Sequence, residues 1–236
     1  MVRIIEEKDF CYYPKNLRNL AVVLTEPYLL HPEDYVNVAA SDAKCVFSHH
    51  RRFVDRYKNW YYYPLGGCHI PDEDRIIHKK SKCISMFISH KETMPGHILR
   101  RKVYDRLRDK IDIYGTGYNY VENKADGLRD YYFSIVIESC QEPGYFTEKI
   151  IDCFLTGTIP IYWGDPNIDD YFHDDGIINW TGDVDELEKK TRVIENACQE
   201  IYKRRLSLAR KNFSEAREYT NYLEWIKRKY TGLLND

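Results

Sequence analysis

The sequence predicts an α/β protein built on two parallel sheets. Short apolar segments rich in β-branched residues alternate along the chain with stretches that have the i, i+3, i+4 spacing of amphipathic helices. Strands that alternate with helices of this length form parallel sheets with helical cover. At 236 residues, with 43% hydrophobic side chains, the chain is long enough to bury a substantial core.

The first third of the chain contains short elements. "RNLAVVLTEP" at 18–27 has a β-branched run that proline ends, which is typical of a buried strand. Helical spacing follows in "PEDYVNVAAS", then a strand at 43–49, a short helix in "RRFVDRYKN" and a strand in "WYYYPLGG" that a glycine turn closes. A polar link at 71–82 comes next. We therefore predict a short first unit at residues 1–75 and a second unit at 76–236.

The second unit repeats the alternation with longer elements. Strands are predicted in "CISMFIS" (83–89), "IDIYGTG", 132–138, "TIPIYWG" and "DGIINW". Amphipathic helices are predicted at 96–110 and from Thr147, and a further pair over 184–232 is expected to cap the sheet. Ligands of such sheets bind at the carboxyl ends of the strands, so we expect site residues in the loops that follow them.

Charge and composition exclude several classes of partner. The formal net charge of -2 gives no bulk attraction for nucleic acid or an anionic membrane. No apolar run is long enough to cross a bilayer, and "MVRIIEEKDF" lacks the apolar core of a signal peptide, so we expect a soluble, cytoplasmic protein without a transmembrane segment. The cysteines are odd in number and never form a CxxC pair, and we expect reduced thiols at all seven: Cys11, Cys45, Cys68, Cys83, Cys140, Cys153 and Cys198.

Metal and dinucleotide sites are not predicted. His49-His50, "PDED" and "DPNIDD" offer ligands but lack recognised zinc or calcium spacing. "GTG" at 115–117 lacks the remaining glycine of a dinucleotide fingerprint. We expect no metal and no cofactor, so any anion must be bound by local protein groups.

Lys149 occupies an unusual position. In "FTEKIIDCF" Thr147 is a good N-cap, and Lys149 lies in the first helical turn, where the helix dipole disfavours a cation by ~0.3–1 kcal/mol. A strand, a glycine-containing loop and a helix start form an anion site, because free backbone N–H groups face the loop. A lysine there is explained by a bound anion; a solvated surface lysine explains the spacing equally well.

A second basic cluster follows strand 83–89. Ser89 and Lys91 lie in the connecting loop, and Arg100 lies in the first turns of the next helix. If this strand shares a sheet with 132–138, Arg100 and Lys149 face one crevice and could neutralise a diphosphate without a metal ion. The alternative is an exposed basic helix face.

Glu26 follows the first predicted strand of the first unit. A carboxylate at that sheet edge, across a cleft from a diphosphate site, is placed to take a proton from an acceptor hydroxyl. Spacing alone does not distinguish it from a turn residue before proline.

These motifs together resemble those of a known enzyme family. "YFSIVIESCQEPGYFTEKIIDCFLTGTIPIYWGDPNI" is similar to the signature of the family 10 glycosyltransferases, the α-1,3/1,4-fucosyltransferases. That signature runs roughly F-x-x-x-x-E-N, a short loop, Y-x-T-E-K, an apolar helix and P-[IV]-x-x-G-x-P-x-[IV]. "TEPYLLHPEDY", "YYPLGG", "SMFISHK" and "GHILRRKVYDRL" fall upstream in the family order, so the resemblance spans about residues 19–180.

The resemblance implies a GT-B architecture of two facing Rossmann-like units. It also implies metal-independent, inverting transfer of fucose from GDP-fucose to a glycan hydroxyl, with Glu26 as general base. Donor-binding roles are implied for the segments after two strands of the second unit: Ser89, Lys91, Arg100, Glu138, Ser139, Tyr145, Glu148 and Lys149.

Two departures from the family pattern leave alternatives open. Ser139 stands where the family usually has asparagine, which keeps another nucleotide sugar as a donor. The first unit is shorter than in family members, which fits a trimmed enzyme, a homo-oligomer in which a second copy completes the unit, or a non-catalytic nucleotide- or carbohydrate-binding remnant.

Overall fold

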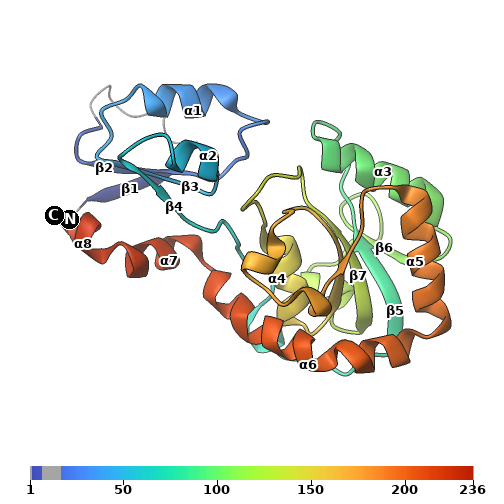
Figure 1. Cartoon of the computed structure of the whole chain (residues 1–236). Coiled ribbons are helices and arrows are strands. Elements are labelled where there is room, and N and C mark those ends of the chain that lie inside the picture. Colours follow the sequence, from blue (N-terminus) through green and yellow to red (C-terminus); the bar gives the residue numbers. More distant parts are fainter. Residues whose placement is uncertain (1, 7–16, 236) are drawn as a thin grey trace.

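Two parallel sheets form the framework of the molecule, and they lie side by side in Figure 1. The computed structural model describes residues 2–6 and 17–235. The first sheet has the order β1-β2-β3-β4, and the second has the order β6-β5-β7-β8-β9. The α/β class and the two Rossmann-like units predicted from the sequence are therefore confirmed.

Helices cover both faces of the first sheet. Its strands are β1 (Arg3–Glu6), β2 (Leu20–Leu24), β3 (Cys45–Ser48) and β4 (Trp60–Tyr62). One face packs on α1 (Pro32–Ala39) and α2 (Arg51–Val54) through Tyr35, Val38 and Phe53. The other face packs on α7 (Tyr222–Lys229) and α8 (Thr231–Asn235) through Ile226 and Leu234. The central strands β2 and β3 are buried on both sides, which explains their continuous apolar sequence.

The second sheet carries the longer elements. Its strands are β5 (Lys82–Phe87), β6 (Asp112–Tyr114), β7 (Tyr131–Ile137), β8 (Ile159–Trp163) and β9 (Ile178–Asn179). One face packs on α3 (Pro95–Leu107), α5 (Val184–Asn196) and α6 (Cys198–Ala216), and the other on α4 (Glu148–Leu155). Short 3-10 helices occur in the loops: η2 (Asp72–Asp74), η3 (Lys124–Gly127), η4 (Ile168–Asp170), η5 (Asp174–Gly176) and η6 (Arg217–Tyr219).

The C-terminal helices return to the first unit. In Figure 1 α6 passes beneath the second sheet, and α7 and α8 continue to the first sheet. The predicted helix pair over 184–232 is wrong in number and in placement, since two of the four helices cover the other sheet. The two ends of the chain also meet, because Val2 N donates a 2.8 Å hydrogen bond to the Leu234 carbonyl.

Two other expectations are corrected. Strand β1 was not predicted, because "RIIE" has only one fully buried side chain, Ile5, and shows no continuous apolar run. The expectation of reduced thiols is wrong for Cys83 and Cys198, which form a disulfide between β5 and the first residue of α6. A separation of 115 residues gave no sequence cue to this pair. Cys11 lies outside the described residues, and Cys45, Cys68, Cys140 and Cys153 are free thiols.

No helix within residues 2–6 and 17–235 is both long and apolar enough to span a membrane. Both faces of the first sheet are covered by helices of this same chain. A second copy that completes the short unit stays a prediction.

Ile226→Ala tests whether α7 stabilises the first unit. The side chain is 0% exposed against Ala21 and Phe47, so its truncation is expected to cost about 2–5 kcal/mol of unfolding free energy. Lys229→Ala, at an exposed position of the same helix, is the matched control and should change stability by less than about 0.5 kcal/mol. Urea denaturation followed by tryptophan fluorescence measures both. Equal midpoints for the two variants would show that the packing of α7 contributes nothing.

Candidate functional site

The loop from β7 to α4 is fixed at both ends. Thr147 is the N-cap of α4, and its hydroxyl accepts from Lys149 N at 3.4 Å, as the sequence predicted. Gly66, in the link from the first unit, donates from its N–H to the Phe146 carbonyl at 3.1 Å. Gly144 has φ +83°, and a Cβ there would lie 3.0 Å from the His49 carbonyl oxygen. Glycine therefore allows the loop to approach the end of β3 closely.

Lys149 compensates a buried carboxylate. Its Nζ lies 3.0 Å from Glu138 Oε2, 2.7 Å from Thr147 Oγ1 and 3.3 Å from Glu148 Oε1. Glu138 is 0% exposed and also accepts from the N–H and hydroxyl of Thr147 at 2.9 and 2.8 Å. A buried charge needs this kind of pairing, which is one reason for a cation in the first turn of α4. With its side chain 25% exposed, Lys149 also keeps a face open to a ligand.

Lys124 extends this network, and the sequence analysis missed it. Its Nζ lies 2.7 Å from Asp152 Oδ2, and Asp152 Oδ1 accepts from His69 N at 2.8 Å. Burial alone raises the pKa of Glu148, but the positive charges of Lys149 and Lys124 outweigh it and hold that pKa at about 2. Glu148 is therefore ionised at neutral pH, and it lies between two lysines. Lys124 comes from a different loop, so its proximity to Glu148 could not be predicted from the sequence.

Arg100 is buried behind the end of β7. It is 7% exposed, and its Nε and Nη2 donate to the Ile137 carbonyl at 2.9 and 2.6 Å. Burial lowers its pKa, while the nearby carboxylates of Glu138 and Glu148 oppose that effect. The guanidinium thus anchors the carboxyl end of the central strand beside the Glu138–Lys149 pair.

His97 shows that the predicted cations converge. Burial, followed by the positive charges of Arg100, Lys91 and Lys149, lowers the pKa of His97 to about 4. Burial is the larger cause, and the added influence of three cations on one imidazole shows that they lie near it. His97 itself sits in the first turn of α3, where its Nδ1 accepts from Met94 N at 3.2 Å. The two basic clusters predicted from separate strands therefore meet in one place.

Tyr145 and Ser139 belong to the same loop. Tyr145 is buried, its ring lies 5.3 Å from that of His49 in the first unit, and Ser139 lies beside its phenol group. Burial lowers the pKa of His49 to about 3, so this histidine is neutral. Ser139 also accepts through its carbonyl from Gly96 N at 2.9 Å, which ties the loop to the start of α3.

The remaining predicted residues lie at the same sheet edges. Glu26 follows β2 and is exposed, and its carbonyl accepts from the Tyr35 hydroxyl at 3.0 Å. Ser89 is half-buried after β5, and Lys91 is exposed before α3. Glu26 thus lies on the first unit, whereas the other two lie on the second.

Residues after β3 contact the second unit. His50 Nε2 lies 3.3 Å from Glu142 Oε2 in the β7–α4 loop. Arg51 donates to the Tyr171 hydroxyl at 3.1 Å and lies over the Tyr62 ring at 4.1 Å. These side chains join the two sheet edges next to the loop. Their contacts with the second unit could not be predicted, because Glu142 and Tyr171 are more than 90 positions away from His50 and Arg51 in the sequence.

A cavity of about 620 Å³ adjoins the network on the side of Lys124. Its other walls come from the link after the first unit, the end of β5 and the loop after β6: His69, Pro71, Phe87, Gly115, Thr116, Tyr120, Val121, Glu122 and Asn123. The volume lies within the ~300–1,000 Å³ typical of small-ligand pockets. Over residues 2–6 and 17–235, no group of three or more His, Cys, Asp or Glu side chains is arranged to hold a metal ion.

The two parallel-sheet units have the fold of the GT-B glycosyltransferases. Solved structures share this fold. A crystal structure of an α1,3-fucosyltransferase with GDP matches with a TM-score of 0.58 at 18% identity, over 93% of this chain and 76% of that chain. Anabaena HepE in complex with UDP matches with a TM-score of 0.62 at 11% identity, over 99% of this chain and 79% of that chain.

The chain belongs to glycosyltransferase family 10 (fucosyltransferase), whose C-terminal region is matched by residues 77–233. The α-(1,3)-fucosyltransferase FucT of Helicobacter pylori is 32% identical over 155 residues. These residues are 63% of this chain and 27% of that protein, so the chain spans about a quarter of the length of this relative.

Glu148→Gln tests the charge network through its pH dependence. The pKa of Glu148 is about 2 in the folded protein and 4.5 ordinarily, so its ionised form stabilises the fold above pH 4.5, and this is lost as the pH falls toward 2. We expect the difference in unfolding free energy between wild type and variant to shrink by about 2 kcal/mol from pH 7 to pH 3. Urea denaturation across this pH range measures the difference, with Glu195→Gln at an exposed position of α5 as control. A constant difference would contradict the network.

Proposed function

We propose that this chain transfers fucose from GDP-fucose to a hydroxyl group of a glycan, with inversion at the anomeric carbon and without a metal ion. The observation that carries this proposal is that Lys149, paired with Glu138, and Arg100, bonded to the Ile137 carbonyl, both lie at the carboxyl end of β7, where with Lys91 they act on His97. Membership of the fucosyltransferase family supports the choice of sugar and nucleotide.

The donor diphosphate would occupy the basic start of α4. The N–H groups at the start of α4 and the amine of Lys149 both suit phosphate oxygens, and fixed cations in a preorganised site need no metal to stabilise a departing diphosphate. Lys149 would then exchange part of its pairing with Glu138 for the ligand. The adjoining cavity lined by Lys124 would hold the nucleoside, and Glu148, whose pKa Lys124 helps to lower, would accept from sugar or ribose hydroxyls.

Glu26 would act as general base from the first unit. Its carboxylate would take the proton of the acceptor hydroxyl while that oxygen attacks C1 of the donor sugar. The bond from C1 to the β-phosphate oxygen would break with its electrons going to GDP, so one displacement inverts the centre. The exposure of Glu26 at the carboxyl end of β2 supports this role, since an acceptor must reach it from solvent.

Ser139 supports a second candidate, transfer from another nucleotide sugar. Serine has a shorter side chain than the asparagine of the family pattern, and here it lies beside Tyr145, which leaves the donor-sugar contacts different. A screen of nucleotide sugars against a panel of oligosaccharides, with products detected by mass spectrometry, separates the two candidates.

Lys149→Met tests the diphosphate site. The variant is expected to bind GDP roughly ten- to a hundredfold more weakly because one charge-assisted hydrogen bond is lost, whereas Lys189→Gln, at an exposed position of α5, keeps wild-type affinity. Isothermal titration calorimetry measures both. In the wild type, GDP should also raise the pKa of His97, seen by NMR, because an anion offsets the three cations. Unchanged affinity together with an unchanged His97 would overturn the site.

Glu26→Gln tests the base. We expect transfer to fall by roughly a hundredfold or more with GDP binding retained, because the amide cannot accept the proton. Glu33→Gln, on the exposed side of α1, is the matched control and should transfer normally. Activity that persists in EDTA is expected for wild type. Normal transfer by Glu26→Gln would refute the assignment, and loss in EDTA that added metal restores would refute metal independence.

A further inference from the structure

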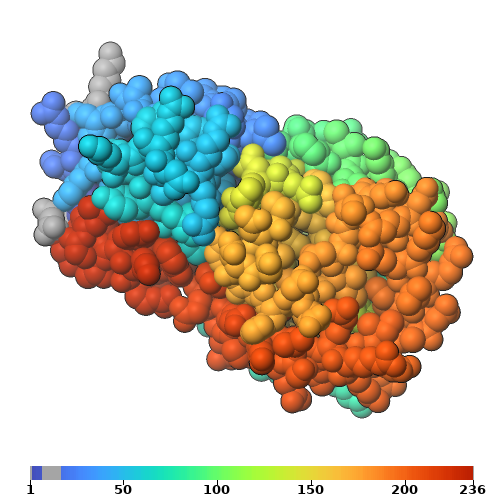
Figure 2. Space-filling model, in the orientation of Figure 1, coloured from blue at the N-terminus to red at the C-terminus, as the bar shows by residue number. Residues whose placement is uncertain are grey.

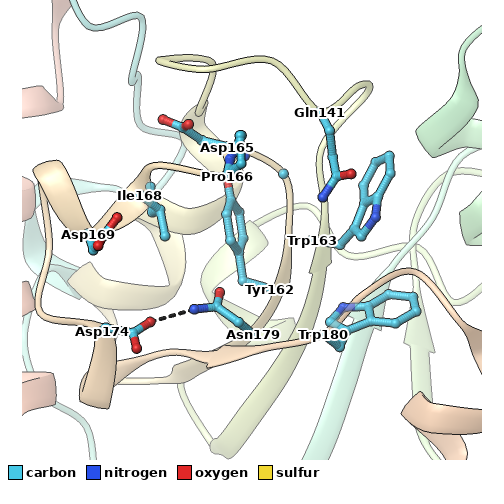
Figure 3. Close-up of a pocket in the computed structure, with 11 residues that line it drawn as sticks. Gln141, Tyr162, Trp163, Asp165, Pro166, Ile168, Asp169, Asp174, Asn179 and Trp180 are labelled. Carbon is cyan, nitrogen blue, oxygen red and sulfur yellow. Dashed lines mark hydrogen bonds between the residues drawn. The ribbon is translucent and has the colours of Figure 1, made fainter.

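A second cavity lies at the carboxyl end of β8, outside the diphosphate site. Its volume is about 310 Å³, near the lower end of the ~300–1,000 Å³ of small-ligand pockets. It is lined by Gln141, Tyr162, Trp163, Gly164, Asp165, Pro166, Ile168, Asp169, Asp174, Asn179 and Trp180. In Figure 3 the indoles of Trp163 and Trp180 lie on one side and the three aspartates on the other, with the Gln141 amide reaching in from above.

The lining has the chemistry of a neutral polyhydroxylated ligand. Asp165, Asp169 and Asp174 contribute carboxylates, and the lining contains no Lys, Arg or His, so a phosphate group would be repelled. Indole rings suit the apolar C–H face of a sugar, and the amides of Gln141 and Asn179 suit its hydroxyls. The cavity therefore differs in kind from the basic site at α4.

One buried donor in the wall lacks a protein partner. Trp180 is 5% exposed, and its Nε1–H makes no hydrogen bond within the described part of the chain. A buried donor left unpaired costs about 1–3 kcal/mol, so a ligand oxygen at this position would be stabilised. Its neighbour Asn179 is held by Asp174, which leaves the amide oriented (Figure 3).

The cavity adjoins the donor loop directly. Glu138 N donates to the Trp163 carbonyl at 2.9 Å, and a Cβ at Gly164 would lie 2.6 Å from Glu138 Cγ. Gln141 comes two residues after Ser139, a span of at most ~7 Å. A molecule in the cavity would therefore lie within about one sugar length of the loop that is proposed to hold the donor.

We propose that this cavity is a saccharide subsite that binds one neutral sugar unit of the acceptor glycan, next to the unit that receives the transferred sugar. The acceptor role rests on the proposed function, whereas binding of a neutral saccharide does not. The expected ligand is uncharged, since the three carboxylates disfavour acidic sugars.

Saccharide binding to the nucleotide-free chain tests the subsite. Neutral di- and trisaccharides such as lactose and maltotriose are titrated while tryptophan fluorescence is followed, with an acidic trisaccharide, sialyllactose, for comparison. We expect at least one neutral sugar to bind and sialyllactose to bind more weakly. Gln141→Ala and Trp180→Phe should each weaken saccharide binding roughly five- to tenfold, which is the effect of one hydrogen bond. Gln199→Ala, at an exposed position of α6, should leave saccharide binding unchanged.

The same variants are titrated with GDP by calorimetry, and their melting temperatures confirm folding. Unchanged GDP affinity with weakened saccharide binding supports the subsite. Absence of binding by every neutral sugar, or equal weakening in Gln199→Ala, overturns it, and so does a parallel loss of GDP affinity. If wild type binds sugars but not GDP, the proposed transfer fails while the subsite stands, so the two failures are distinguishable.

Discussion

The buried Glu138–Lys149 pair is the interaction on which the rest of the site depends. Glu138 lies at the end of the central strand β7 with no exposure to solvent, and an isolated carboxylate there would carry a large desolvation cost. Thr147 and Lys149 offset that cost from the first turn of α4, and the Glu138 N–H bonds to the end of β8. The Glu138 side chain thus joins the end of β7 to the start of α4, and its backbone N–H joins that end to β8.

The loop between Glu138 and Thr147 also connects the second unit to the first. The loop that carries Glu138 at one end and Thr147 at the other is contacted by His49 and His50 after β3 and by Gly66 in the link. Helices α7 and α8 return from the second unit to cover the first sheet, as Figure 2 shows for their red surface next to the blue one. The two units are therefore joined both by contacts of the first unit with this loop and by the C-terminal helices that pack on the first sheet.

Charge is divided between the two sides of that loop. On the side of α3 and α4, burial and then the positive charges of Arg100, Lys91 and Lys149 lower the pKa of His97, and a site with these cations suits a phosphorylated ligand. On the side of β8, carboxylates and indoles line a cavity without cations, which suits an uncharged one. In the proposed transfer the nucleotide donor would use the first environment and a neighbouring unit of the acceptor glycan the second, so the two must lie a short distance apart.

The sequence by itself determined the fold class, most of the elements and the family. Hydrophobic periodicity located eight of the nine strands that the described residues form, and the start of α4, because buried strands and helices must present apolar side chains at fixed intervals. Motif order indicated the family and singled out Lys149. Only the tertiary structure decided that Lys149 forms an ion pair with Glu138 and that Lys124 and His97 lie close to this pair. It also decided that Cys83 forms a disulfide with Cys198 and that α7 covers the first sheet. These are contacts between residues distant in sequence, and local spacing carries no information about such pairs until folding brings them together.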